Sequence, residues 1–599
     1  MTSDITIGQS GRNQKSSDPG ASPNADSSRG LDEIGHRTPA SATRAIPERY
    51  EVEEAAQRTQ IAQRQYQMYP HLSDARIAKV RRFGHIEHWK ANEVMFRTGE
   101  RSEGMRLLVQ GRVKLVVRDG LGRSRLFRAV EERQFLGETA TLSGKPYLVD
   151  AIAVTDVESI LVPPEQLRAL LIAEAQLGSE IMRAFILRRI ALIQEGSGPT
   201  LLGAPTNPRL IALADLLRRV NHPHRVLDPT ADGEALEFLA KIPLSGAEVP
   251  VAVLVDGTVL EDPSEIQLCS ALGILCGFDE LVTYDTVIVG AGPAGLAAAV
   301  YAASEGLSVL VLDAKGFGGQ AGASARIENY LGFPTGISGH VLVSRAFEQA
   351  VKFGADIVIQ SEVAKLNCAK SPFEIQLVDN RVAIARTVII ASGAAYRRPQ
   401  ISGLDNVNGR GVYFWASSIE GRLCRDTEIV LVGGGNSAGQ AIVFLASYAS
   451  HIHVLVRRDG LEETMSRYLV DRVTSLANVT IHEKSVVESV GYDEDGLTEV
   501  LFKSPRGRES VQTRHLFLFT GAEPSTAWLR DCGVEVDEKG FVITDRPDGA
   551  AHRFAFQTSV PGVFAIGDVR SSSIKRVASA VGEGAAVVSE IHTLLANQH

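Results

Sequence analysis

The sequence predicts a multidomain protein in which a β jelly roll and a small α/β domain precede two nested α/β domains with parallel sheets. Three observations carry this prediction. The chain of 599 residues is too long for one hydrophobic core. Residues 76–196 contain short runs with apolar residues at alternate positions, separated by glycine-containing turns, as in antiparallel barrels. From residue 283 onward, an apolar strand, a glycine turn and a helix follow one another twice, which is typical of parallel α/β folds.

The overall composition is that of an ordinary globular protein, with 44% hydrophobic and 22% charged residues and a net charge of −9. This spread negative charge argues against nucleic acid or an anionic membrane surface as a partner. Five cysteines in so long a chain do not predict a disulfide framework, and no two form a C-x-x-C pair. We therefore expect a cytoplasmic protein, with no membrane-spanning run and no metal site.

The first domain is preceded by a polar tail. Residues 1–46 are rich in Ser, Gly, Pro, Asn and Asp and are expected to be disordered, and residues 47–75 to form a helical lead-in. Residues 76–196 carry an FRTGE turn, an LLVQGRVKLVV strand pair, and the run Phe135 to Glu138 before a short helix. In these features the segment resembles cyclic-nucleotide-binding domains.

The resemblance implies that Glu138 would accept a ribose hydroxyl and that an arginine farther on would hold the cyclic phosphate. Tyr147 stands at the place of that arginine. A tyrosine lacks the charge-assisted, bidentate hydrogen bonds that an arginine offers a phosphate. We therefore favour a structural or docking domain, with cyclic-nucleotide binding as the less favoured alternative that stays open. No helix-turn-helix follows it, so control of transcription is not expected either.

Residues 204–281 predict a smaller α/β domain. A helix, a strand and a second helix lead to a strand, an Asp-Gly hairpin and a closing helix, and this order resembles thioredoxin and glutaredoxin. Val249–Pro250 stands where that family keeps a cis-proline, but Gly203–Thr206, at the place of the redox pair, holds no thiol. We therefore predict a redox-inactive adaptor, in which Cys269 and Cys276 are structural.

The segment TYDTVIVGAGPAGLAAAVYAASEGLSVLVLD predicts a nucleotide-binding turn. Gly290, Gly292 and Gly295 form G-x-G-x-x-G between an apolar strand and a helix, and Asp313 ends the next strand. The first glycine permits the turn, the second lets the backbone approach a pyrophosphate, and the third lets helix and strand pack closely. Asp313 would accept an adenosine ribose hydroxyl.

A second nucleotide-binding turn follows another apolar strand. Gly433, Gly435 and Ala438 form G-x-G-x-x-A, and Arg457 and Arg458 end the next strand in place of an acid. Arginines there accommodate the 2′-phosphate of NADPH, so we predict NADPH, with NADH as the open alternative. Two such folds imply two nucleotides whose reactive rings can meet.

Residues 283–599 resemble a low-molecular-weight thioredoxin reductase. Besides both turns, the resemblance rests on GGQ at 318–320, on IENYLGFPTGISG, on ASG at 391–393 and on PGVFAIGDVR. It implies an FAD-binding domain over 283–402 and 520–599, an NAD(P)H-binding domain over 403–519, and a homodimer. The residues it places at FAD are Gly290, Gly292, Pro293, Ala294, Gly295, Asp313, Gly319, Gln320, Asn329, Gly567, Asp568, Arg576 and Val577. Those at NAD(P)H are Gly433, Gly435, Asn436, Ser437, Ala438, Arg457 and Arg458.

The sequence departs from that family where the catalytic cysteine pair belongs. Trp415 and Ser418 stand at the places of the two cysteines, and Cys424 follows without a partner. Serine forms neither a disulfide nor a thiolate, so the route from flavin to thioredoxin is interrupted. The candidate catalytic residues are therefore Trp415, which could stack on the flavin, Ser418 and Cys424.

Three functions remain open on the sequence. The first is an NAD(P)H-dependent flavoprotein that passes electrons to ferredoxin, flavodoxin, a quinone or another acceptor, as ferredoxin–NADP reductases of similar build do. The second is a thioredoxin-disulfide reductase that uses Cys424 or a cysteine of its partner. The third is a redox sensor in which the N-terminal domains report the state of the flavin. The acceptor itself is not predicted.

Overall fold

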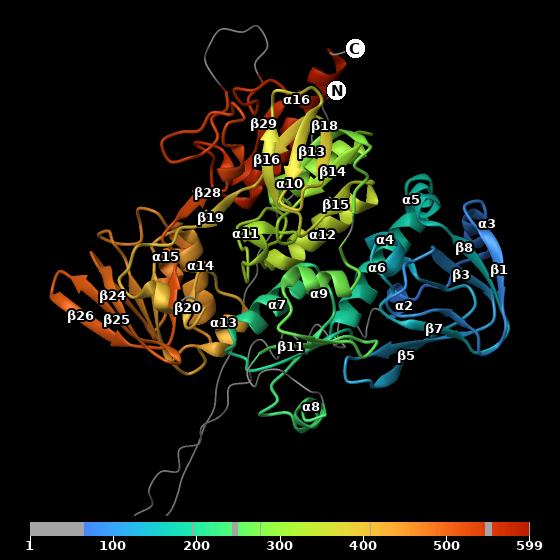
Figure 1. Cartoon of the computed structure of the whole chain (residues 1–599), viewed down its shortest axis with the longest axis horizontal. Helices are drawn as coiled ribbons and strands as arrows, with labels where there is room; N and C mark the ends of the chain where they lie inside the picture. Colours follow the sequence, from blue (N-terminus) through green and yellow to red (C-terminus); the bar gives the residue numbers. More distant parts are fainter. Residues whose placement is uncertain are drawn as a thin grey trace, which may run out of the picture. The chain divides into compact units, whose positions relative to one another are not determined.

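The computed structural model describes residues 65–194, 197–241, 249–275, 277–407, 409–545 and 554–597. The predicted tail, most of the lead-in helix and Cys276 lie outside these residues. The described chain begins with α2 (Gln65–Met68) and α3 (Asp74–Arg81) (Figure 1). Throughout this part of the chain, no helix is both long and apolar enough to cross a bilayer.

The N-terminal domain is built from two four-stranded antiparallel sheets. Along β4, buried and more exposed side chains alternate, because successive residues of a strand point to opposite faces. One sheet has the order β1 (His85–Trp89), β8 (Val157–Val162), β3 (Met105–Gln110), β6 (Phe135–Leu136). The other has the order β2 (Val94–Phe96), β7 (Asp150–Ala153), β4 (Val113–Arg118), β5 (Ser124–Val130). The helices are α4 (Glu138–Ser143), α5 (Pro164–Ala173) and α6 (Ala175–Gln194).

The next sheet has the order β10 (Arg225–Leu227), β9 (Thr200–Leu202), β11 (Val251–Val253), β12 (Val259–Glu261). β9 is parallel to β10 and antiparallel to β11. Its helices are α7 (Pro208–Arg219), α8 (Gly233–Leu239) and α9 (Glu265–Ala271). The expected cis-proline is wrong: among the described residues the cis bond is Ser371–Pro372, and Val249–Pro250 adopts the trans form, which is the lower-energy state of such a bond.

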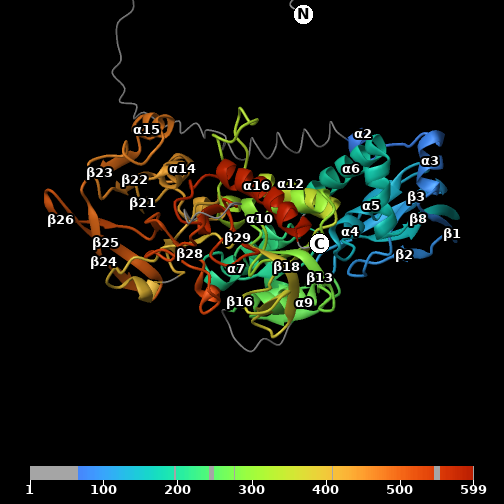
Figure 2. The same ribbon diagram turned by 90° about the horizontal axis from the view of Figure 1, so that it is seen from above.

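A seven-stranded sheet forms the centre of the first of two α/β units. β13 (Thr283–Val289) lies between β14 (Val309–Leu312) and β18 (Val382–Ile390) and is parallel to both. Beyond β14 comes β15 (Asp356–Val358), and beyond β18 the antiparallel strands β17 (Phe373–Leu377) and β16 (Val363–Asn367). The seventh strand, β29 (Val563–Ala565), comes from the C-terminal part of the chain and pairs in parallel with β18. Its helices are α10 (Pro293–Ser304), α11 (Gly319–Gly322), α12 (Gly339–Lys352) and α16 (Val577–Ala596), and α10 packs against α12 and α16 (Figure 2).

A five-stranded parallel sheet forms the centre of the second α/β unit, with the order β20 (Val412–Tyr413), β27 (Leu516–Leu518), β21 (Glu428–Val432), β22 (His451–Leu455), β23 (Val479–His482). Three antiparallel strands adjoin it, β24 (Val486–Asp493), β25 (Gly496–Ser504) and β26 (Gly507–Gln512). Its helices are α13 (Ser418–Leu423), α14 (Asn436–Leu445) and α15 (Arg467–Thr474). A two-stranded ribbon, β19 (Ala394–Tyr396) with β28 (Ala522–Pro524), is made by the two segments that connect this unit to the first one.

Candidate functional site

The first glycine turn lies between β13 and α10. Gly290 has a φ of +113°, and a Cβ there would lie 2.3 Å from the Ala391 carbonyl oxygen. A Cβ on Gly295 would lie 1.9 Å from the Gly290 carbonyl oxygen, so helix and strand pack too closely for any side chain. Gly292 differs, because the nearest atom to a Cβ there is 3.9 Å away. The fold itself requires the first and third glycines, and the second keeps open the space before the helix N-terminus.

Asp313 ties this turn to the end of β14. Its Oδ2 accepts a hydrogen bond from the Ala291 N–H at 2.8 Å, and its Oδ1 accepts from the N–H groups of Lys315 and Gly316 at 2.9 and 3.0 Å. These bonds hold the carboxylate beside the glycine turn. A carboxylate has about four acceptor positions, so one remains for a ribose hydroxyl.

The segment from Gly318 to Gln320 approaches the same helix start. Gly318 donates its N–H to the Ala291 carbonyl oxygen at 2.8 Å, and a Cβ on Gly319 would lie 3.2 Å from the Cα of Gly292. Gln320 donates its side-chain Nε2 to the carbonyl oxygen of Ala394, where the β19 strand begins. The predicted residue Asn329 lies farther along, exposed in the loop between α11 and α12.

The segment that follows β29 also contacts the start of α10. A Cβ on Gly567 would lie 2.9 Å from the Cβ of Ala294, in the first turn of α10. The Gly567 N–H donates to Glu583 Oε2 at 2.6 Å, and Glu583 also pairs with Arg570 at 2.7 Å. Burial raises the pKa of the Asp568 carboxyl. Gly292, Gly319 and Gly567, which are far apart in the sequence, thus converge on the start of α10.

The start of α16 belongs to the same neighbourhood. Val577 is its first residue and Arg576 its N-cap. A Cβ on Gly584 would lie 2.5 Å from the Ala294 carbonyl oxygen and 2.8 Å from the Ala297 Cβ, so α16 and α10 are in close contact. Two helix N-termini, with glycines at the closest approaches, are a setting that suits a dinucleotide pyrophosphate.

The second glycine turn repeats this geometry between β21 and α14. Gly433 has a φ of +145°, and its Cβ would lie 2.7 Å from the Phe519 carbonyl oxygen. Gly435, the N-cap of α14, has no atom within 4 Å of a Cβ position. Asn436 Oδ1 accepts the Ser466 N–H at 2.7 Å, Ser437 is exposed, and Ala438 is buried. This turn therefore also leaves space at a helix N-terminus for phosphate.

Arg457 and Arg458 follow β22 and are both exposed. Arg458 forms an ion pair with Glu463 at 2.5 Å, in which both side chains are about half exposed. Exposed pairs of this kind contribute little to stability. Both guanidinium groups are accessible to a phosphate at the end of this strand.

The segment from Trp415 to Cys424 is ordered around a buried carboxylate. Glu420 Oε2 accepts the Ser417 N–H at 2.8 Å, which together with the Ser417 hydroxyl forms a capping box for α13, and its Oε1 accepts the Trp415 Nε1–H at 3.1 Å. Ser418 is the first residue of α13. The sequence prediction missed Glu420, although the Ser417-x-x-Glu420 spacing is a capping-box signal.

Cys424 has no solvent exposure and lies in the apolar core of the second unit. Burial raises the pKa of its thiol to about 12. Its Sγ–H donates to the Gly421 carbonyl oxygen at 3.5 Å. The thiolate form, which is the nucleophile in disulfide chemistry, is therefore strongly disfavoured at neutral pH.

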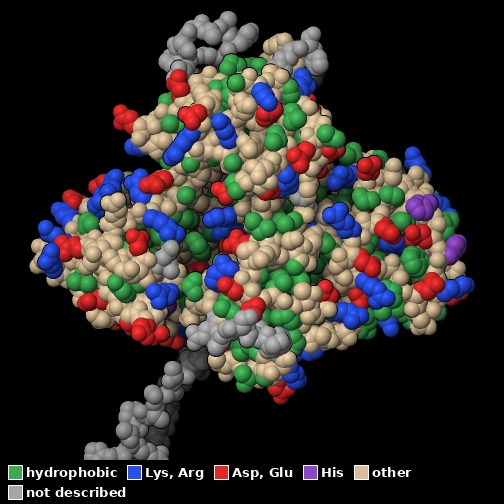
Figure 3. All heavy atoms as spheres, viewed as in Figure 1, with side chains coloured by type: hydrophobic (Ala, Val, Ile, Leu, Met, Phe, Trp, Pro, Cys, Tyr) green, Lys and Arg blue, Asp and Glu red, His purple; other side chains and the backbone are tan. Residues whose placement is uncertain are grey.

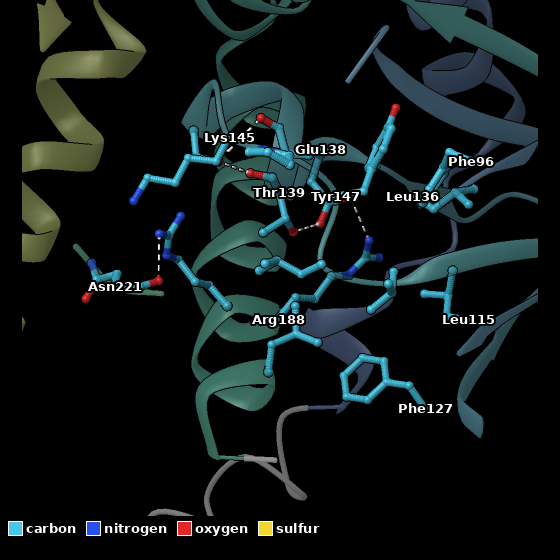
Figure 4. A pocket seen from close by; sticks show the side chains of 18 of the residues that line it. Phe96, Leu115, Phe127, Leu136, Glu138, Thr139, Lys145, Tyr147, Arg188 and Asn221 are labelled. Atoms are coloured by element: carbon cyan, nitrogen blue, oxygen red, sulfur yellow. Dashed lines mark hydrogen bonds and ion pairs between the residues drawn. The ribbon is translucent and has the colours of Figure 1, made fainter. Parts of the chain in front are cut away.

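The N-terminal domain contains a small pocket around Glu138 and Tyr147 (Figure 4). Glu138 forms a 2.8 Å ion pair with Arg188, and their side chains are only 1% and 5% exposed. The Tyr147 ring stacks on Phe96 with centroids 3.8 Å apart, and its hydroxyl accepts a hydrogen bond from Arg106 at 3.2 Å. The remaining cavity measures about 50 Å³. Pockets for drug-sized ligands typically hold about 300–1,000 Å³, so this one is too small for a nucleotide as it stands.

Comparisons with known proteins agree with this arrangement. Residues 86–174 match the model of the cyclic nucleotide-binding domain, and residues 284–584 that of the pyridine nucleotide-disulphide oxidoreductases. The chain is 35% identical to a thioredoxin reductase of Treponema pallidum (strain Nichols) over 317 residues, which are 52% of this chain and 98% of that protein. It is 32% identical to a thioredoxin reductase of Escherichia coli O157:H7 over 303 residues, covering 50% and 92%.

Among solved structures, the thioredoxin reductase of Lactococcus lactis in its FR conformation is 29% identical, with a TM-score of 0.49, over 53% of this chain and 100% of that one. The family model extends over half of the present chain, and the T. pallidum relative is covered almost completely. The chain therefore belongs to the pyridine nucleotide-disulphide oxidoreductase family, as a thioredoxin reductase-like, NAD(P)H-dependent flavoprotein oxidoreductase that carries an N-terminal cyclic nucleotide-binding domain.

Proposed function

We propose that this enzyme takes hydride from NADPH and passes electrons from FAD directly to an external acceptor, without an internal dithiol. One observation carries the proposal: the segment from Trp415 to Cys424 offers a single thiol, and that thiol is fully buried. FAD, when bound, supplies the two-electron chemistry, and the protein supplies binding, orientation and a dry site.

The residues around the start of α10 are proposed to hold FAD. Gly292 leaves room for the pyrophosphate beside the helix N-terminus, and Asp313 would accept the adenosine ribose hydroxyl. Gly567 and Asp568 would lie along the ribityl chain, and α16 would direct its N-terminus at the isoalloxazine. The FAD-binding domain is proposed to comprise residues 283–402 and 520–599, with Gln320 and Asn329 near the flavin.

NADPH is proposed to bind the domain formed by residues 403–519. The open space at Gly435 would admit its pyrophosphate, and Arg457 and Arg458 would pair with its 2′-phosphate. These two arginines favour NADPH over NADH, which has a free hydroxyl there. The side chain of Trp415, held by Glu420, is proposed to stack against the flavin.

The class of electron acceptor follows from the lack of an accessible thiol in the segment from Trp415 to Cys424. A redox protein or small molecule such as ferredoxin, flavodoxin or a quinone can take electrons from a flavin without any cysteine of this chain. Thioredoxin-disulfide reduction is the second candidate, because the curated relatives named above are thioredoxin reductases. It would need Cys424 or a partner's cysteine, and the raised pKa of Cys424 opposes its use. A third possibility is a sensor that reduces its flavin but turns over slowly with every acceptor.

The deciding experiment is an anaerobic NADPH titration of the purified holoenzyme in its fully oxidised state. We expect the flavin absorbance to bleach after about one equivalent, because two electrons fill the flavin. Consumption of a second equivalent with a long-wavelength thiolate–flavin band would refute the proposal. The Cys424→Ser variant is the matched control, since it would abolish that second phase only if Cys424 were responsible.

The two N-terminal domains are proposed to be structural or docking modules. The first would be a jelly roll over residues 76–196 whose nucleotide site is closed. Arg188 forms an ion pair with Glu138, and the ring of Tyr147 fills the space where the phosphate of a nucleotide would lie. The second, over residues 204–281, would be a thioredoxin-type adaptor without redox cysteines. Calorimetry with cyclic AMP and cyclic GMP at up to millimolar concentration should detect no heat of binding, and saturable binding of either would refute this role.

Two further properties are proposed from the family. The enzyme is expected to form a homodimer, as thioredoxin reductases do, and to act in the cytoplasm. Basic and acidic side chains are interspersed over the visible face in Figure 3, which gives no support to a nucleic-acid surface. Size-exclusion chromatography with light scattering at micromolar concentration tests the dimer, and a mass of one chain would contradict it.

A further inference from the structure

Three histidines lie together on one face of the five-stranded sheet in the second α/β unit. His451 and His453 belong to β22, and His482 ends the neighbouring strand β23. His453 lies opposite Thr480 in the parallel register, and residues two apart on a strand point to the same side, so His482 shares the face of His453. Glu428, the first residue of β21, lies opposite His451 on that face. Adjacent strands therefore bring these ionisable side chains together.

Two ring nitrogens in this group approach each other closely. His453 Nδ1 lies 3.2 Å from His482 Nε2. In a tetrahedral zinc site each Zn–N bond is about 2.0–2.1 Å long, so two imidazole ligands of one ion lie about 3.3–3.4 Å apart. In the metal-free protein a proton on one of the two nitrogens is shared with the other. The separation of these nitrogens is thus already close to that of two ligands of one zinc ion.

The other ring nitrogen of His453 faces a carboxylate. Its Nε2 lies 3.4 Å from Glu428 Oε2, and the His453 and Glu428 side chains are 18% and 57% exposed. An ionised carboxylate only accepts hydrogen bonds, so the proton of neutral His453 belongs on Nε2, and its Nδ1 keeps a lone pair. Burial lowers the pKa of His453 and of His482, so both rings are neutral at neutral pH, which is the form that binds metal. Zinc-binding histidines commonly have such a carboxylate at their second nitrogen.

Neighbouring side chains hold these rings in place. The His482 ring meets the ring of Phe502 in β25 edge-on, with centroids 5.2 Å apart. The centroid of His453 lies 4.8 Å from that of His451 and 5.4 Å from that of His482. His451 Nε2 already contacts Thr480 Oγ1 at 2.8 Å. A pair that is ordered before binding loses little side-chain entropy when an ion arrives.

We propose that His453 and His482 are a binding site for a divalent transition-metal ion of the zinc type. His453 Nδ1 and His482 Nε2 are the two protein ligands, and Glu428 positions the ring of His453. In the part of the chain that the structure describes, no three His, Cys, Asp or Glu side chains are grouped to hold a metal ion. Water therefore completes the coordination, so the ion is exchangeable, unlike the ion of a closed structural site. Imidazole nitrogens suit Zn²⁺, whereas Mg²⁺ prefers oxygen ligands.

The test is a zinc titration of the full-length, FAD-loaded enzyme without a purification tag. After treatment with EDTA and removal of the chelator, isothermal titration calorimetry with ZnCl₂ should show saturable binding that excess MgCl₂ does not displace. His453→Gln and His482→Gln should each weaken this binding by at least about tenfold, since loss of a carboxylate behind a ligand alone costs about 10- to 100-fold. The absence of Zn²⁺ binding, or equal affinity in the wild type and both variants, would overturn the proposal.

His451→Gln is the matched control, because His451 lies on the same strand and the same face. It should bind Zn²⁺ as the wild type does, and a loss equal to that of His453→Gln would overturn the choice of ligands. Glu428→Ala should weaken binding by about tenfold and Glu428→Gln by less, because glutamine still accepts a hydrogen bond. Equal affinity in those two variants and the wild type would overturn the positioning role of Glu428.

A measurement on the wild type decides even if a histidine variant fails to fold. X-ray absorption of the zinc-loaded enzyme distinguishes imidazole ligands from water. We expect two imidazole nitrogens at about 2.0–2.1 Å, with oxygen neighbours completing the coordination. A spectrum without a pair of imidazole ligands would overturn the proposal.

Discussion

Replacement of Gly435 by alanine isolates the contribution of the second nucleotide-binding turn. Gly435 has extended backbone angles that alanine adopts freely, and no atom lies within 4 Å of the added Cβ. The free energy of unfolding should therefore change by less than about 0.5 kcal/mol. The methyl group instead occupies the space through which a pyrophosphate approaches the N–H groups of α14.

The expected loss of NADPH affinity can be estimated from the hydrogen bonds between the pyrophosphate and the N–H groups of α14. Loss of one hydrogen bond to a charged phosphate costs about 1.5–3 kcal/mol, and each 1.4 kcal/mol is a factor of ten in affinity. The Kd for NADPH should thus rise about 10- to 100-fold in Gly435→Ala. FAD content should stay at the wild-type level. Fluorescence titration with NADPH measures the first quantity, and absorbance of the released flavin measures the second.

Gly292→Ala is the matched control in the first turn. Its Cβ also meets nothing nearer than 3.9 Å, so this variant should fold but lose FAD, the reverse of the pattern in Gly435→Ala. Gly295→Ala should instead fail to fold, because its Cβ would lie 1.9 Å from a carbonyl oxygen. A folded, FAD-loaded Gly435→Ala enzyme with unchanged NADPH affinity would refute the reasoning.

Three other predictions follow from the same structure. Cys424→Ser should keep steady-state turnover within about twofold, since burial raises the pKa of that thiol to about 12; a large loss would favour disulfide chemistry. Arg457→Ala combined with Arg458→Ala should raise the KM for NADPH by about tenfold or more and leave that for NADH nearly unchanged, and equal effects on both would contradict the 2′-phosphate role. Burial lowers the pKa of His515 to about 4, so below its ordinary value of about 6.5 the unfolded chain binds a proton that the folded chain does not. Acidification from pH 7 to 4 should therefore lower the free energy of unfolding by up to about 3 kcal/mol through this residue, and denaturation of His515→Gln with an unchanged pH slope would contradict it.

Features that are local in the sequence were predictable. Each glycine turn is encoded within one strand–turn–helix segment, so residue spacing alone located Gly290, Gly295 and Gly433 at positions where a Cβ would clash with the backbone. The alternating runs of the N-terminal domain likewise predicted its antiparallel strands, since side chains on a strand alternate between faces. The capping box of Glu420 was equally local and could have been found.

Contacts between distant segments were not predictable from spacing. The ion pair of Glu138 with Arg188 joins residues 50 positions apart, and it accounts for the small size of the cavity in the N-terminal domain. From the sequence, only the replacement of an arginine by Tyr147 indicated that this cavity would not hold a nucleotide. The isomer of the Val249–Pro250 bond was predicted wrongly, since the resemblance to thioredoxin implied a cis bond and the bond is trans. Standing at the place of a family's cis-proline does not determine the isomer when the surroundings differ.

The sequence by itself determined the order of the strands and helices, the two glycine turns with their arginines or acid, and the absence of a cysteine pair before the second turn. Only the tertiary structure decided that Gly292, Gly319 and Gly567 meet at one helix start, and that Cys424 is buried. The physical reason is that spacing controls which residues share a turn or a face, whereas burial and thiol acidity depend on segments that sheet pairing brings together from distant parts of the chain.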